Sequence, residues 1–474
     1  MKRVVSLVLV LGLAAFLAVA DVHADVRLPK LFGDHMVVQR NQPTVVWGWA
    51  DAGEKVTVDL AGNKADATAG SDGKWSVKVS TPPAGGPYEL TIAGKNTVKL
   101  SDVLVGEVWI CSGQSNMEWS VRQSQDAEKE IAAANHARIR HIKVEHTPAD
   151  KPQDDLVTKQ GWQVCTPESV PAFTAVGYFF ARNLQDALDV PVGLIGSNWG
   201  GTRIEPWTPP VGFEQVPALK DIADQLSAMP AKLADGKINH QTPLALYNGM
   251  IHPLVPFAVQ GAIWYQGESN NGEGMLYFEK KKALIGGWRK LWDRPEMPFY
   301  FVQLAPYKYG ANRQPADLAG IWEAQLKSLE IPHTGMAVTV DIGDVKDIHP
   351  RNKQEVGRRL ALWALAKTYG KQLVYSGPLY ASHAVEGDKI RIKFQHAGGG
   401  LTARDGKPLS HFEIAGDDGN FVAATATIDG ATVVVHSEKV AKPSAVRFAW
   451  DQIAEPNLSN QEGLPASPFR TSSK

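Results

Sequence analysis

The sequence predicts an α/β protein with a mostly parallel central sheet, covered by helices on both faces and flanked by β-rich regions. Residues 102–372 carry the first observation, because continuous apolar runs such as VGLIGSNWG alternate there with helical stretches. Residues 25–101 show short alternating runs broken by Gly, Asn and Asp, which indicate an N-terminal β-sandwich domain. After residue 373 the helical periodicity stops, so residues 373–474 are expected to form a C-terminal β-rich region.

The composition is that of a globular protein without a strong overall charge. The chain has 474 residues, 44% hydrophobic and 21% charged, which is enough for about three domains. Its 49 Lys and Arg residues nearly balance 50 Asp and Glu residues. No global field is therefore available to attract nucleic acid or an anionic membrane.

Residues 1–24 have the pattern of a signal peptide. Two basic residues precede an apolar run from Val4 to about Ala20, and small residues suited to a signal peptidase follow. Cleavage is expected after Ala24, with Ala20 as the alternative. The apolar run is too short for a comfortable membrane span, so the mature protein is expected in the periplasm or outside the cell, without a stable membrane span.

Cys111 and Cys165 are the two cysteines of the chain. Two are too few for a disulfide framework, although an oxidising compartment permits one bridge. Nothing in the sequence brings them together, so two buried thiols are the preferred interpretation.

The first candidate for chemistry is Ser115, in the segment VWICSGQSNMEWS at residues 108–120. A buried strand runs into Gly113, and a strand-to-turn junction can display a serine hydroxyl above a sheet. The serine does not lie in a G-x-S-x-G elbow, which argues against an ordinary α/β-hydrolase. Taken alone, the segment is equally compatible with a turn that caps a helix.

The second candidate is His349, which follows a predicted strand and an acidic loop. Asp347 lies two residues before it and could orient the imidazole, with Asp344 and Asp341 as competitors. The alternative is that these acids only stabilise the N-terminus of the following helix.

Two further loops, at residues 196–207 and 264–274, supply candidate oxyanion donors. Acyl transfer needs N–H groups aimed at the developing oxyanion. Gly200 or Gly201 could give a backbone N–H, and Gln266 or Asn270 a side-chain amide. Each loop alone could be plain turn chemistry, but four such loops after predicted strands favour a common site.

Taken together, four blocks resemble the SGNH or GDSL-like hydrolases, and most closely the sialate O-acetylesterase family. They are GQSNMEW at 113–119, NWGGTRIEPW at 198–207, WYQGESN at 264–270 and DIHPRNKQEVGRRLA at 347–361. The resemblance implies a flavodoxin-like three-layer α/β/α SGNH catalytic domain that uses no metal or other cofactor. It also implies an acyl-enzyme mechanism with Ser115 as nucleophile, His349 as base and Gly201 or its neighbour Gly200 as backbone donor.

The sequence departs from the SGNH pattern at two places. The third block reads Q-G-E-S-N instead of the commoner G-x-N, which leaves the second donor open between Gln266 and Asn270. The position three residues before the histidine, where the family often has its acid, is Lys346. Asp347 is therefore the preferred orienting acid, ahead of Asp344.

Residues of the second block suggest how a sugar could bind. Trp199 could stack on the apolar face of a sugar ring, as could Trp119 and Trp207, and Arg203 could bind a carboxylate. The alternatives are that the tryptophans belong to the core and that Arg203 forms a structural ion pair with Glu205.

The expected function is therefore hydrolysis of O-acetyl groups on a carbohydrate substrate, by a serine esterase. Fold and catalytic residues do not encode the sugar, so sialic acid, xylan and pectin esters all remain open. The alternative is a catalytically inactive carbohydrate-binding protein on the same scaffold.

Overall fold

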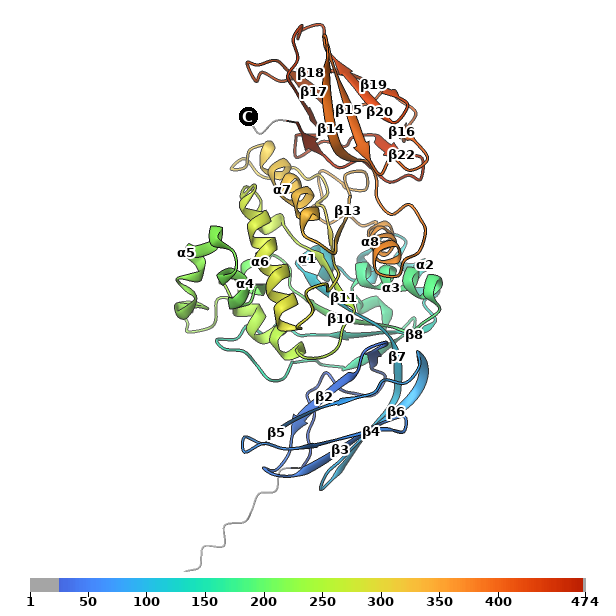
Figure 1. Ribbon diagram of the computed structural model, residues 1–474, viewed down its shortest axis with the longest axis vertical. Helices are drawn as coiled ribbons and strands as arrows, with labels where there is room; N and C mark the ends of the chain where they lie inside the picture. The colour runs from blue at the N-terminus through green and yellow to red at the C-terminus, as the bar shows by residue number, and fades with distance from the viewer. Residues whose placement is uncertain (1–24, 472–474) are drawn as a thin grey trace, which may run out of the picture.

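The computed structural model describes residues 25–471, in which β-rich regions lie at both ends of an α/β region (Figure 1). The predicted signal peptide, residues 1–24, lies outside the described residues. Among residues 25–471, no helix combines the length and apolarity needed to cross a membrane.

The central sheet of the α/β region is mostly parallel, as predicted. Its strands follow the order β13-β12-β11-β7-β10-β8-β9, and only β9 runs antiparallel to its neighbour. Every residue of β10 to β13 is buried, which explains their continuous apolar runs. The strands are β7 (Thr97–Gly113), β8 (His136–Lys143), β9 (Trp162–Cys165), β10 (Val192–Asn198), β11 (Gly261–Tyr265), β12 (Phe299–Val302) and β13 (Thr334–Ala337).

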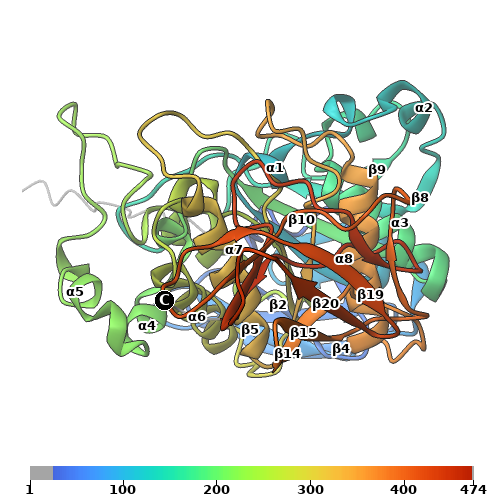
Figure 2. The ribbon, with the colours of Figure 1, turned by 90° about the horizontal axis from the view of Figure 1, so that it is seen from above.

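Helices cover the sheet on both sides, which confirms the three-layer prediction. Figures 1 and 2 show α3 (Ala175–Leu188) and α8 (Lys353–Lys367) on one side. On the other side lie α4 (Pro210–Glu214), α6 (Leu276–Leu291) and α7 (Ala316–Lys327). The shorter helices are α1 (Ser115–Glu118), α2 (Ala127–Ala132) and α5 (Lys220–Ala223).

The close packing of α3 against α8 depends on a glycine. A Cβ atom at Gly357 of α8 would lie 2.6 Å from the Cβ of Phe179 and 2.7 Å from the backbone nitrogen of Phe180, both on α3. Asn352 caps α8, because its side chain accepts a hydrogen bond from the backbone N–H of Glu355 at 3.0 Å. The start of α8 is thereby fixed just after His349.

The N-terminal region shares a strand with the catalytic region. The first half of β7 pairs with β6, and its second half pairs with β10 and β11. One continuous strand of 17 residues thus crosses the expected boundary at residues 101/102. The other strands of this region are β1 (Val37–Gln39), β2 (Thr44–Trp49), β3 (Lys55–Leu60), β4 (Asn63–Thr68), β5 (Lys74–Val79) and β6 (Gly85–Ala93).

The C-terminal region forms two four-stranded sheets, in the orders β14-β15-β20-β19 and β18-β17-β21-β23, and one short pair, β16-β22. It has a hydrophobic core of its own, whereas the N-terminal and catalytic regions share a single core. Its strands are β14 (Leu379–Glu386), β15 (Lys389–Gln395), β16 (Leu401–Ala403), β17 (Phe412–Ala415), β18 (Val422–Ala423), β19 (Thr425–Asp429), β20 (Thr432–His436), β21 (Ala445–Phe448), β22 (Leu458–Asn460) and β23 (Phe469–Arg470).

Both cysteines are buried and neither forms a disulfide. Burial raises the pKa of the Cys165 thiol to about 12 and that of Cys111 still further. The preferred interpretation as two buried thiols is confirmed.

Candidate active site

The predicted nucleophile lies at the carboxyl end of β7, where ligands bind in open α/β sheets. Gly113 ends the strand with φ 128°, and a Cβ atom there would lie 2.2 Å from the carbonyl oxygen of Tyr265 on β11. Only glycine fits this position. The chain then turns at Gln114, and Ser115 is the first residue of α1.

Ser115 and His349 are brought together from positions 234 residues apart. His349 Nε2 lies 2.9 Å from Ser115 Oγ, which is hydrogen-bond distance for a nucleophile and its base. The indole of Trp119 stacks on the imidazole, with ring centroids 4.5 Å apart and an interplanar angle of 19°. Trp119 therefore covers one face of the histidine ring.

Of the three candidate acids, Asp347 alone contacts His349. Its Oδ1 accepts a hydrogen bond from the His349 backbone N–H at 2.9 Å and lies 3.7 Å from the imidazole Nδ1. The second distance exceeds that of a hydrogen bond. Asp341 is instead paired with Arg359 at 2.6 and 2.7 Å, and Asp344 accepts the backbone N–H of Lys346 at 2.8 Å.

The surroundings of His349 favour its neutral form. Burial lowers the pKa of its imidazole below the usual 6.5, and the charge of Lys353 lowers it further, whereas Asp347 opposes the shift. Lys353 is itself fully buried, and burial lowers its pKa to about 7. A neutral imidazole can accept a proton at Nε2, as a general base must.

Three buried polar residues that the sequence did not single out join the nucleophile turn to the histidine loop. Asn116 Nδ2 donates to Glu268 Oε1 at 2.6 Å and to the Ile348 carbonyl oxygen at 3.0 Å. Lys353 Nζ donates to Asn116 Oδ1 at 2.5 Å. Burial raises the pKa of Glu268. We call Asn116, Glu268 and Lys353 the Asn116 network.

The sequence contains one signal for this network. Each of its three members lies inside one of the four sequence blocks that resemble the SGNH hydrolases. Polar residues in strand-end loops are also common in ordinary turns, however. Their burial, which the sequence does not reveal, is what distinguishes them.

The two amide side chains expected in the oxyanion hole have a different role. Gln266 Nε2 donates to the Thr202 carbonyl oxygen at 3.1 Å and to Asn270 Oδ1 at 2.7 Å. Asn270 Nδ2 donates to Glu205 and to Glu273, both at 3.1 Å. Both side chains are fully buried and every amide N–H has a protein acceptor. The expectation that either amide offers a free donor is therefore corrected: the two amides cross-link the loops.

Gly200, rather than the preferred Gly201, lies beside the nucleophile. A Cβ atom at Gly200 would lie 3.2 Å from that of Ser115, whereas one at Gly201 would meet no other residue within 4 Å. The Gly200 N–H donates to Glu118 Oε2 at 2.7 Å. Of the two glycines, Gly200 is thus the one that the structure brings next to Ser115.

Glu118 is a charged neighbour of the nucleophile that the sequence did not reveal. Its Oε1 lies 2.8 Å from His146 Nε2 and 3.1 Å from Lys143 Nζ. Burial alone would raise the pKa of Glu118, but its contacts with His146, Lys143 and Gly200 lower it to about 2. The side chain is therefore a carboxylate throughout the neutral range.

Trp199 has no free ring face for a sugar. Its indole lies between the imidazoles of His146 and His240, at 4.3 and 4.5 Å and with interplanar angles of 2° and 7°. The expectation that Trp199 stacks on substrate is therefore corrected. Trp207 is buried in the core, where its Nε1 donates to Thr202 Oγ1 at 3.0 Å.

Arg203 belongs to a neutral ion cluster. Its guanidinium contacts Glu205 at 2.9 Å and also Glu273, while the buried Lys280 contacts the same two carboxylates at 2.7 Å each. Two cations and two anions balance each other. Arg203 thus forms the structural ion pair with Glu205 that was the alternative interpretation. Its guanidinium is not free to bind a substrate carboxylate.

Comparisons with known proteins agree with this fold. A family model described as carbohydrate esterase, sialic acid-specific acetylesterase, matches residues 105–366. The sialate O-acetylesterase of Pongo abelii is 34% identical over 411 residues, which cover 78% of this chain and 77% of that protein. The sialate O-acetylesterase of Homo sapiens is 33% identical over 411 residues, with the same shares covered.

A solved structure resembles the whole molecule. The crystal structure of a carbohydrate acetylesterase from Xanthomonas citri superposes with a TM-score of 0.87 at 40% identity, covering 95% of this chain and 100% of the other. The chain is thus a carboxylic ester hydrolase of the carbohydrate esterase class. Within that class it belongs to the family of sialic acid-specific acetylesterases, as the four blocks indicated.

Proposed function

We propose that this carbohydrate acetylesterase works through an acyl-enzyme intermediate, with Ser115 as nucleophile and His349 as general base. The observation that carries the proposal is the 2.9 Å contact between Ser115 Oγ and His349 Nε2. It has the geometry that proton transfer from a serine hydroxyl requires.

The reaction proceeds in two halves. His349 Nε2 takes the Ser115 proton as Oγ attacks the acetyl carbonyl carbon, and the imidazolium then gives that proton to the departing sugar oxygen. In the second half, His349 takes a proton from water, whose oxygen attacks the acetyl-serine. Acetate leaves, and the proton returns to Ser115 Oγ.

The oxyanion is proposed to be stabilised by backbone N–H groups. Ser115 N–H has no acceptor among residues 25–471, and the close approach of Gly200 to Ser115 places a second N–H beside it. The Gly200 N–H now donates to Glu118, so it would have to share its proton with the oxyanion or turn from the carboxylate.

A neutral acetylated polysaccharide is the substrate class that we favour over an acetylated sialic acid. Sialate carries a carboxylate, and Arg203, the cation expected to bind it, is already neutralised by Glu205 and Glu273. Comparing acetate release from acetylated xylan with that from an O-acetylated sialic acid tests this choice. A clear preference for the sialic acid would overturn it.

The catalytic assignment is tested by replacing the serine. Ser115→Ala is expected to lower acetate release by at least about 10³-fold with an unchanged fold. Ser269→Ala is a matched control, because this serine follows a neighbouring strand and its hydroxyl makes no hydrogen bond within residues 25–471. Full activity of Ser115→Ala would contradict the assignment of Ser115 as the nucleophile. A wild-type protein that releases no acetate would favour the alternative of an inactive carbohydrate-binding protein.

We also propose that the protein is exported to the periplasm or the medium. The pattern of residues 1–24 supports this location. Sequencing the N-terminus of the mature protein should give Asp25 as its first residue, whereas a retained Met1 would contradict export.

A further inference from the structure

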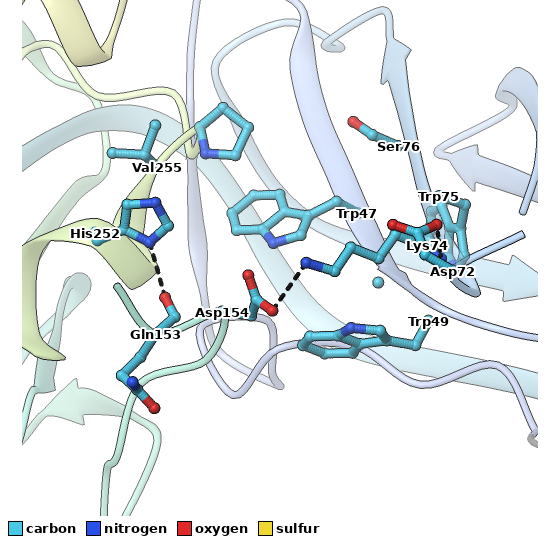
Figure 3. A pocket seen from close by; sticks show the side chains of 12 residues that line it. Trp47, Trp49, Asp72, Lys74, Trp75, Ser76, Gln153, Asp154, His252 and Val255 are labelled. Atoms are coloured by element: carbon cyan, nitrogen blue, oxygen red, sulfur yellow. Dashed lines mark hydrogen bonds and ion pairs between the residues drawn. The ribbon is translucent and has the colours of Figure 1, made fainter. Parts of the chain in front are cut away.

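A cavity of about 420 Å³, separate from the candidate active site, lies between the N-terminal and catalytic regions (Figure 3). Small-molecule sites typically enclose about 300–1,000 Å³. One wall is formed by β2 and β5, and the other includes His252 and Val255, which precede β11. Ser115 follows the carboxyl end of β7, a parallel neighbour of β11, so the cavity lies at the opposite edge of the sheet.

Two tryptophans of β2 contribute aromatic surface to the cavity. In the antiparallel pair of β2 and β5, Trp47 lies opposite Ser76 and Trp49 opposite Lys74. Because side chains alternate along a strand, these four share one face of the sheet. Trp47 and Trp49 are both half-buried, so each leaves part of its ring accessible.

Both indoles are held in place by other residues. Trp47 packs edge-on against Phe32 and Phe257, with ring centroids 4.8 and 6.5 Å apart. The guanidinium of Arg27 lies 4.4 Å from the ring centroid of Trp49 and so supports one of its faces. Neither indole N–H has an acceptor within residues 25–471. The cavity therefore offers rigid ring surface together with free donors.

Polar groups line the rest of the cavity. Lys74 Nζ lies 2.9 Å from Asp154 Oδ2, and the two side chains remain 51% and 55% exposed. In the view of Figure 3 this pair reaches across between the two indoles. His252 Nδ1 donates to the Gln153 carbonyl oxygen at 2.9 Å, and its Nε2 makes no hydrogen bond among the described residues.

The charges at the cavity balance each other. Asp72 and Asp154 place two carboxylates here, and Lys74 and the Arg27 guanidinium over Trp49 supply two cations. No net positive charge is left to attract a sugar acid, whereas hydroxyl groups could donate to the carboxylates and accept from the ammonium and the indoles.

We propose that this cavity, the Trp47–Trp49 pocket, binds an uncharged pyranose unit of a carbohydrate chain. Aromatic faces suit the apolar faces of pyranose rings, and exposed polar groups beside them suit the hydroxyls. The proposal rests on the proposed function in one respect, because that function makes a neutral polysaccharide the molecule that the enzyme meets. Since the pocket lies at the far edge of the sheet from Ser115, it holds a polymer near the enzyme without contacting the reacting ester.

Binding of xylohexaose, a neutral sugar chain without esters, tests the pocket by isothermal titration calorimetry. Trp49→Ala is expected to weaken binding at least fivefold. Trp450→Ala is the matched control. Trp450 is also half-buried, and the guanidinium of Arg470 lies 5.0 Å from its ring centroid, but it belongs to the C-terminal region, away from the pocket. Trp450→Ala should bind xylohexaose like the wild type.

Kinetics separate the pocket from the catalytic site. Trp49→Ala should raise KM for acetylated xylan several-fold while kcat and KM for 4-nitrophenyl acetate stay unchanged. If Ser115 is not the nucleophile, Ser115→Ala fails its own test but xylohexaose binding and its loss in Trp49→Ala remain. Failure of the pocket is therefore distinguishable from failure of the catalytic assignment.

Three results would overturn the pocket: no xylohexaose binding by the wild type, equal binding by Trp49→Ala, or tighter binding of sialyllactose that Trp49→Ala abolishes. Lys74→Ala provides a second variant if Trp49→Ala does not fold, because Lys74 is exposed. It should also weaken xylohexaose binding, and unchanged binding in a folded Lys74→Ala protein would then contradict the proposal.

Discussion

The protonation state of His349 sets the pH range in which Ser115 can be activated. Burial and Lys353 lower the pKa of this imidazole, so kcat/KM for 4-nitrophenyl acetate should rise with an apparent pKa below 6.5. Lys353 has a pKa of about 7 and is thus charged over this range. Lys353→Met removes a positive charge, which favours the imidazolium, and should move the acidic limb to higher pH.

The pH profiles of the wild type and Lys353→Met check this directly. If the acidic limb of the kcat/KM profile stays in place or moves to lower pH in Lys353→Met, the charge of Lys353 does not lower the pKa of His349. A uniform loss of activity at every pH would point to a purely structural role for Lys353.

Asp347 is expected to contribute less than the acid of a tightly bonded triad. Removing such an acid can cost about 10⁴-fold in kcat, but Asp347 Oδ1 lies 3.7 Å from Nδ1 and its side chain is 47% exposed. Asp347→Asn is therefore expected to lower kcat by only about tenfold. Asp344→Asn, in the same loop, is the control and should leave kcat unchanged. Equal losses in the two variants would remove Asp347 from the site.

At the scale of loops and strands, Asn270 distinguishes a structural amide from an oxyanion donor. Asn270→Ala removes contacts with Gln266, Glu205, Glu273 and the backbone N–H of Ile204. Buried groups left without partners cost about 1–3 kcal/mol each, so the free energy of unfolding should fall by several kcal/mol in denaturant titration. Loss of a true oxyanion donor would instead lower kcat by about 10²–10³-fold with little change in stability.

The strand-end loops were largely predictable from the sequence, because each block follows an apolar run that ends at the same edge of the sheet. The partners of their side chains were not. Trp199 is covered by His146 and His240. Asn270 accepts from Gln266 and donates to two carboxylates, those of Glu205 and Glu273, whose counter-charge includes Lys280 of α6. Such long-range neighbours leave no local pattern in the sequence.

The burial pattern along β7 explains why the sequence suggests a domain boundary near residue 101. Residues 97–102 of β7 alternate between exposed and half-buried, and from Val103 every residue is buried. This change in pattern resembles a boundary between domains. The change marks the point at which β7 leaves a sheet with one solvated face and enters a sheet that is covered on both faces.

For the whole molecule, the shared core makes the N-terminal region inseparable from the catalytic region. A variant that begins at residue 102 loses the first five residues of β7 and uncovers Phe257, which packs on Trp47. It is expected not to fold. A variant that ends at residue 376 loses a region with its own core and should fold, with a lower Tm because the contact of Ser467 with Gln303 is lost.

Circular dichroism and scanning calorimetry of the two truncated proteins check this difference. Cooperative unfolding of the variant that begins at residue 102, at a Tm near that of the full chain, would show that the N-terminal region is an independent domain.

The assignment of Ser115 as the nucleophile is tested most directly by covalent trapping with a fluorophosphonate. One serine should be modified, and mass spectrometry should find it in the peptide that contains Ser115. His349→Ala should abolish the modification, because no other base lies at hydrogen-bond distance from Ser115 Oγ among residues 25–471. Modification of another serine, or undiminished modification of Ser115→Ala, would contradict the assignment.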